Sequence, residues 1–266
     1  MGHAEPDIAE LFAPLRPAQA FEVVLNEARQ VLAHVRAPID AELWGSDMLG
    51  ALSGTRSDST RSDGPVSGSP VSGRTGSGES NDVMAELADS LVPAAEESAT
   101  PEALALLRIL SALGSPAVRS AAAAAADRVH ASGVPNPVWA AGLGAPTVGP
   151  CWHYSDVGGR QESVTATFSY GASEHALSVL IDHGRLGRIR DVWVADADGL
   201  LDKTWLAAET DPLVIFEEID PADARARLQR AISAGECPVK PDEADDLTAH
   251  RALLHARVRL LSARAG

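Results

Sequence analysis

The sequence has few cysteines and few basic residues, and each shortage excludes a class of protein. Cys151 and Cys237 are the only cysteines, and they form no Cys-x-x-Cys pair. We therefore expect two free thiols that are buried or half-buried. The formal net charge is -15. Because phosphate contacts need clustered Lys and Arg, this balance argues against binding to nucleic acid.

Long apolar runs are also missing. No stretch of about 18 consecutive apolar residues is present, and the alanine run at 121–126 is far too short to cross a bilayer. The first residues show no basic region followed by an apolar run, so we expect no signal peptide. These features predict a cytoplasmic protein that does not associate with membranes.

The common catalytic motifs are absent as well. The sequence contains no Gly-x-Ser-x-Gly elbow, no His-Glu-x-x-His pattern and no Cys₂His₂ pattern. Gly144 and Gly149 have the glycine spacing of a phosphate loop, but Pro150 stands where that loop needs lysine. The lack of motifs favours a binding protein over an enzyme.

Composition divides the chain into four parts. Residues 1–52 show apolar residues at helical spacing and predict N-terminal helices. Residues 53–81 are rich in Ser, Gly, Thr, Asp and Arg and predict a disordered linker or loop, which is either an inert tether or a segment for phosphorylation or binding. Residues 82–149 predict a helical hairpin region, and residues 150–266 an α+β domain.

Two helix starts in the hairpin region are clearly marked. Thr100 and Ser115 are good N-caps, and each is followed by a proline at the first helical position. Residues 134–162 are rich in Pro and Gly, so we expect extended or turning chain there and no regular element.

The C-terminal part contains the only residues that favour a sheet. Val164, Ala166, Phe168 and Tyr170 alternate with polar residues, as in a half-buried strand. The same reasoning predicts strands at 163–170, 174–183, 191–195 and 213–219, and helices at 200–208, at 221–234 and from 241 onward. We therefore predict an α+β fold with a helical N-terminal half packed on a small antiparallel β-meander, one face of which is covered by helices, and two C-terminal helices.

The best candidates for chemistry lie at the end of the second predicted strand. Asp182 and His183 precede a glycine-rich turn, where Asp191 could approach them. A histidine with one or two carboxylates can bind a divalent metal or act as a general base. The competing interpretation is structural, because a strand-end aspartate usually caps a turn.

Three arginines follow these candidates. Arg185, Arg188 and Arg190 could bind a phosphate or carboxylate group. They could equally pair with the acidic residues of the chain itself.

A second pair of reactive residues is Cys151 and His153. Residues two apart share a face in extended chain, so a nucleophile–base pair is conceivable. No third orienting group is identifiable, and packing of the neighbouring aromatic residues is the competing interpretation.

Four segments carry a resemblance to a known family. The chain resembles a family of high-GC actinobacterial proteins that has no known activity, at residues 41–50 (AELWGSDMLG), 100–108 (TPEALALLR), 133–141 (GVPNPVWAA) and 174–183 (EHALSVLIDH). The likeness covers most of the chain except the predicted linker. It implies an intracellular bacterial setting and a single co-folded unit, and it supplies no cofactor or catalytic residue.

Two functions remain open on these grounds. The first is a non-catalytic intracellular binding or regulatory protein whose acidic helical surface meets another protein. The alternative is a metal-dependent hydrolase of phosphoesters, with Asp182, His183 and Asp191 at a divalent metal and the arginines as an anion clamp. The two differ in whether these side chains converge in one pocket.

Overall fold

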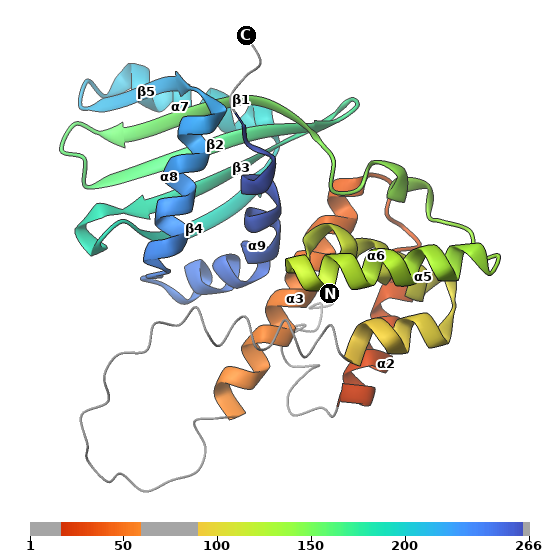
Figure 1. Cartoon of the computed structure of the whole chain (residues 1–266). Helices are drawn as coiled ribbons and strands as arrows, with labels where there is room; N and C mark the ends of the chain where they lie inside the picture. The colour runs from red at the N-terminus through yellow and green to blue at the C-terminus, as the bar shows by residue number, and fades with distance from the viewer. Residues whose placement is uncertain (1–16, 60–89, 263–266) are drawn as a thin grey trace, which may run out of the picture. The chain divides into compact units, whose positions relative to one another are not determined.

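The computed structural model describes residues 17–59 and 90–262, and it divides the chain into two compact units (Figure 1). Unit 1 is Met1–Leu143, and unit 2 is Gly144–Gly266. The described part of unit 1 is helical, while unit 2 contains a five-stranded antiparallel sheet and three helices. The predicted α+β class is therefore confirmed.

Unit 1 is arranged around one buried helix. Eight of the thirteen residues of α5 (Pro101–Leu113) are buried, and all eight are apolar. Contacts with α5 come from α2, α3 and α6, and η1 contacts α3. The bounds of these elements are α2 Pro17–Val31, α3 Pro38–Ser59, α6 Pro116–Ala131 and η1 Val138–Gly142, and residues 90–98 are also helical.

Both predicted helix starts in unit 1 are confirmed. The Thr100 side chain accepts a hydrogen bond from the backbone N–H of Ala103 at 3.2 Å, and Ser115 accepts one from Val118 at 3.4 Å. These bonds satisfy N–H groups that have no partner inside the helix. Helix α3 continues to Ser59, so the first residues of the predicted linker are helical, and its residues 60–81 lie outside the described part of the chain.

The sheet of unit 2 has the order β4-β3-β2-β1-β5, with every neighbouring pair antiparallel. Strands β1 to β4 form a meander, and β5 returns to pair with β1. The strands are β1 Thr147–Asp156, β2 Gln161–Tyr170, β3 Ser173–Asp182, β4 Arg188–Ala195 and β5 Val214–Ile219, and η2 (His183–Arg185) joins β3 to β4.

The sequence prediction was wrong for strand β1. The Pro- and Gly-rich stretch at 134–162 was expected to hold no regular element, yet Thr147–Asp156 is a strand of the sheet. The pairing of β1 with β2 shifts between Val148 and Cys151, which places Gly149 and Pro150 in an irregularity of the strand. Proline cannot donate to a ladder and is tolerated at such a bulge.

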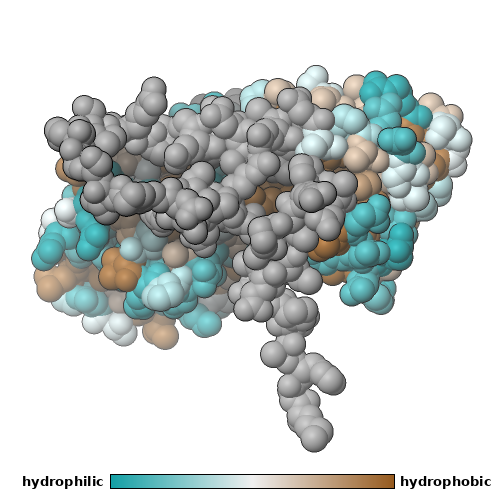
Figure 2. Space-filling model, turned by 90° about the horizontal axis from the view of Figure 1, so that it is seen from below, coloured by the Kyte–Doolittle hydropathy of each residue, from teal (hydrophilic) through white to brown (hydrophobic). Residues whose placement is uncertain are grey.

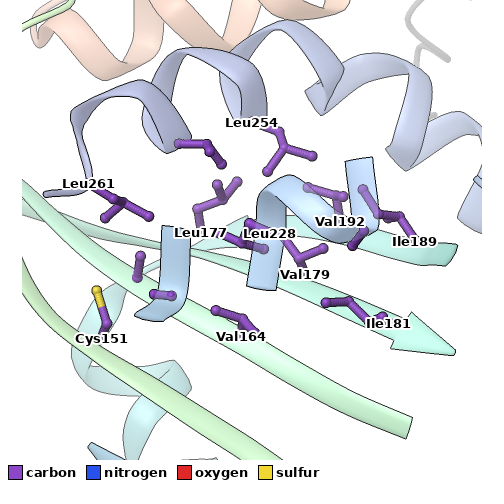
Figure 3. Close-up of a cluster of buried hydrophobic side chains, with 14 of the residues drawn as sticks. Cys151, Val164, Leu177, Val179, Ile181, Ile189, Val192, Leu228, Leu254 and Leu261 are labelled. Atoms are coloured by element: carbon purple, nitrogen blue, oxygen red, sulfur yellow. The ribbon is translucent and has the colours of Figure 1, made fainter. Parts of the chain in front are cut away.

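The hydrophobic core of unit 2 lies on one face of the sheet, which we call the first face. Helices α8 (Pro221–Ala234) and α9 (Pro241–Leu260) cover it. Figure 3 shows Leu228 of α8 and Leu254 of α9 close to the strand residues Leu177 and Val179 in one buried cluster. Cys151 is in this core, and both cysteines are free and buried, as expected.

The opposite face, the second face, carries helix α7 (Ala197–Thr210). Trp205 of α7 meets Trp152 and Phe216 edge-on, with ring centroids 6.5 and 5.8 Å away. Helices therefore lie on both faces, whereas the sequence predicted cover on one. Beside this aromatic group, the hydroxyl of Ser178 bonds to both Ser163 and Thr165 at 2.8 Å.

The surface shows no membrane-spanning element among the described residues. None of the helices in that part of the chain is both long and apolar enough to cross a bilayer. On the face drawn in Figure 2, the coloured residues are a mixture of hydrophilic and hydrophobic types.

Candidate functional site

A buried carboxylate lies at the centre of a polar site in unit 2. Glu162 lies near the start of β2, and only 7% of its surface is exposed. It occupies the first face, since Val164 two residues later is in the core. A charge at such a position needs partners, because burial without them costs several kcal/mol.

Three basic side chains supply these partners. His153 and Arg227 contact Oε2 of Glu162 at 3.0 and 2.7 Å, and His183 contacts Oε1 at 3.2 Å. We call these four residues the Glu162 cluster. Both carboxylate oxygens of Glu162 therefore have partners.

Sheet register and one helix bring the cluster together. Ser155 of β1 and Ile181 of β3 lie opposite Glu162, so His153 and His183 are each two residues away from its direct neighbours. Residues two apart in a strand share a face, so His153 lies on the first face. His183 directly follows β3, as the first residue of η2, and its contact with Glu162 brings it to the same site. Arg227 comes from α8, which covers that face.

The electrostatics of Glu162 follow from these contacts. Burial alone raises the pKa of Glu162, but the hydrogen bond from His153 and the charges of Arg227, His183 and His153 outweigh it and lower this pKa to about 2. The carboxylate therefore stays ionised at neutral pH.

His153 joins the cluster to the edge of the sheet. Its Nε2 faces Glu162, while its Nδ1 lies 3.3 Å from Oε1 of Glu217 on β5. The ring therefore links the carboxylates of two strands, Glu162 of β2 and Glu217 of β5.

A pocket of about 360 Å³ opens beside the cluster. We call it the Glu162 pocket. The lining residues are Glu162, Ile181, His183, Leu186, Gly187, Arg227, Arg230, Ala231 and Ala234. They come from β2, β3, the β3–β4 connection and α8.

The predicted metal ligands do not gather here. His183 belongs to the Glu162 cluster, but Asp182 is its neighbour in an extended strand end, and Asp191 lies opposite Leu180 on the second face. Within residues 17–59 and 90–262, no three His, Cys, Asp or Glu side chains are grouped as ligands of one metal ion. The metal-centre hypothesis therefore stays a prediction from the sequence.

The side chain of Asp191 is partly buried. Its Oδ1 is buried and has no hydrogen-bond partner among the described residues. Burial, and then the charges of Asp246 and Glu243, raise the pKa of Asp191.

The three predicted anion-binding arginines have different surroundings. Arg190 donates to Glu243 at 2.9 Å, which is the pairing with the chain's own acid that was weighed as the competing interpretation. Arg185 and Arg188 are exposed and form no ion pair with a described residue. All three lie close enough to Cys237 to lower its pKa, but burial and Asp182 outweigh them and raise it.

The nucleophile–base pair of Cys151 and His153 is not supported by their surroundings. Cys151 is fully buried in the hydrophobic core, while both ring nitrogens of His153 face carboxylates. Reasoning from the sequence missed Glu162 and Arg227 altogether. A glutamate near the start of a strand and an arginine in a helix match no sequence motif, so only their contact in space identifies them.

The edge of the sheet forms a second candidate site. Among the described residues, β5 pairs with β1 on one side and with no strand on the other. The opposite edge of the sheet is partly covered, because Ile189 of β4 exchanges backbone hydrogen bonds with Gly235 and Cys237. We call the free side of β5 the β5 edge.

Apolar and acidic side chains surround the β5 edge. Trp205, Leu206, Leu213 and Ile215 are large apolar residues that are 51, 62, 61 and 42% exposed. Exposed acids lie among them, namely Glu209, Asp211, Glu217, Glu218 and Asp220. Large apolar side chains gathered on an acidic surface are typical of an interaction site.

Comparison with known proteins gives no relative. No family model, no curated protein and no solved structure matches the chain.

Proposed function

We propose that the chain is a non-catalytic binding protein that takes an extended segment of another protein at the β5 edge. The observation that carries this proposal is the unpaired side of β5, flanked by exposed apolar and acidic residues. A free strand edge presents backbone N–H and C=O groups to which a further strand can bind.

The side chains of β5 specify what kind of segment would fit. Ile215 and Glu217 belong to the first face, and Phe216 and Glu218 to the second, so each face offers one apolar and one acidic position. Cross-strand pairs prefer apolar opposite apolar and opposite charges opposite each other, each contributing about 0.2–1 kcal/mol.

A complementary partner therefore has two basic and two apolar residues in succession. Paired antiparallel to β5, it would read basic-basic-apolar-apolar from its N-terminus. The acidic charge of the whole chain, -15, would also attract such a partner over a longer range.

The test is binding of short synthetic peptides, measured by fluorescence polarisation at low and high salt. A peptide containing Lys-Arg-Val-Ile should bind, and its reversed-charge version with Glu-Glu-Val-Ile should not. The same basic peptide with N-methylated backbone amides should lose binding, since it cannot complete the ladder.

A matched pair of variants places the binding site. Glu218→Arg should weaken binding of the basic peptide by roughly tenfold, because it replaces a charge attraction by a repulsion. Glu174→Arg, also an exposed strand glutamate but near the β2–β3 turn, should leave binding unchanged. Equal affinities for both variants, or undiminished binding of the methylated peptide, would contradict the proposal.

A further inference from the structure

The Glu162 pocket is separate in its chemistry from the β5 edge. Its lining carries two arginines and one histidine, but a single carboxylate. Arg227 and His183 are both bonded to that carboxylate. Arg230 is exposed and has no hydrogen bond or ion pair with any described residue.

Charge in the pocket is therefore unbalanced. Glu162 cancels one positive charge, and Arg227 and Arg230 together bring two. Either charge state of His183 leaves the total positive. A cavity with excess positive charge and partly apolar walls favours a small anion over a cation or a neutral molecule.

The geometry also shows what holds the pocket in shape. The Nη1 atom of Arg227 is 2.7 Å from Glu162, and Nε2 of His183 is 3.2 Å from it, so one buried carboxylate fixes two basic side chains from different elements. Preorganised groups bind a ligand with a smaller entropy cost. Ile181 and Ala231, both buried, supply the apolar part of the wall.

From these observations we infer that the Glu162 pocket binds a small oxyanion, a carboxylate or a phosphate group, with Arg230 as its main contact. His183 and Arg227 complete the positive surface, and Glu162 is a positioning residue that does not touch the ligand. The volume of about 360 Å³ admits a compact molecule.

The experiment is a titration of the purified full-length chain with inorganic phosphate and, separately, with propionate at neutral pH and constant ionic strength. Binding is followed in proton–carbon NMR spectra by the Cε1–H signal of His183, assigned through a His183→Gln variant. We expect that signal to shift in a saturable way with at least one of the two anions. A larger shift with phosphate than with propionate would identify a phosphate site, and the reverse a carboxylate site.

Substitution of Arg230 decides whether the pocket is responsible. Arg230→Gln should weaken binding at least about tenfold, since a hydrogen bond to a charged group is lost. Arg36→Gln is the matched control, because Arg36 is an exposed arginine of unit 1 that does not line the pocket. We expect that control to bind like the unaltered chain.

Two results would overturn the inference. One is the absence of any saturable change at His183 with either anion. The other is equal affinity in Arg230→Gln and Arg36→Gln, which would mean that the anion binds elsewhere. Arg230 is exposed, so its replacement is not expected to unfold unit 2.

Discussion

Replacing His175 with glutamine should make the stability of unit 2 less sensitive to mild acid. His175 is 5% exposed, and its ring stacks on Phe168 and Tyr170 with centroids 5.7 and 6.1 Å away. Arg257, which is fully buried, places Nη2 3.2 Å and Nε 3.3 Å from Nε2 of His175. Because a guanidinium only donates, Nε2 must accept, and the imidazole is neutral with its proton on Nδ1.

The size of the effect follows from the pKa of His175. Burial, and then the positive charge of Arg257, lower that pKa from 6.5 to about 4. The stabilisation that a buried, neutral His175 provides is therefore fully present above pH 6.5 and is lost as the pH falls toward 4. Its full size is about 3 kcal/mol, of which about 2 kcal/mol disappears between pH 7.5 and pH 5.

The measurement is the free energy of unfolding in urea at these two pH values. Glu162 does not affect this comparison, because its lowered pKa makes stability depend on pH only below 4.5. Glutamine can still accept from Arg257 but does not titrate, so His175→Gln should lose about 2 kcal/mol less on acidification than the unaltered chain. His250→Gln serves as the control, because His250 is a partly exposed residue of the same unit and bonds to the backbone of its own helix. If His175→Gln and the unaltered chain lost equal stability, the reasoning would be refuted.

Three further substitutions test local features of the fold. Gly45→Ala should lower the thermal midpoint and destabilise unit 1 by about 1–3 kcal/mol, because the added methyl group would overlap the side chain of Ile109. Thr100→Ala should cost about 1 kcal/mol in urea unfolding by removing the N-cap of α5, and Thr100→Ser should restore it. Glu243→Gln should lower the urea midpoint of unit 2 at neutral pH. The contacts of Glu243, chiefly the hydrogen bond from Arg190, lower its pKa to about 2, so its stabilisation is present above 4.5 and lost as the pH falls toward 2. An unchanged midpoint in any of the three would contradict the corresponding contact.

Local patterns predicted most elements of the fold. Thr100 and Ser115 mark helix starts through side-chain chemistry that acts over three residues. The alternation in β2 reflects an apolar core on the first face, although Thr165 and Thr167 on the second face are buried too. Strand β1 was missed because Gly149 and Pro150 interrupt its beginning, and a bulge is visible only in the paired sheet. Had Cys151–Asp156 been read as a strand, its hairpin with β2 would have placed His153 near Glu162.

The rest of the Glu162 cluster could not be predicted in this way. Arg227 lies 65 residues from Glu162 in the sequence, and their contact depends on how α8 crosses the sheet. His183 was singled out for its neighbours Asp182 and Asp191, but the register gives it Glu162 as a partner instead. Which residues share a face in a strand is a local property, whereas which helix covers that face is not.

The place of β5 in the sheet also has a kinetic consequence. Strands β1 to β4 are joined by short connections, so their pairs can form as successive hairpins. Strand β5 must instead find β1 across the whole meander and α7, as the pairing of Asp156 with Val214 shows. Contacts between distant residues cost more chain entropy and slow folding. We therefore expect β5 to dock last during folding, so that a newly made chain exposes β1 as its sheet edge before it acquires the β5 edge.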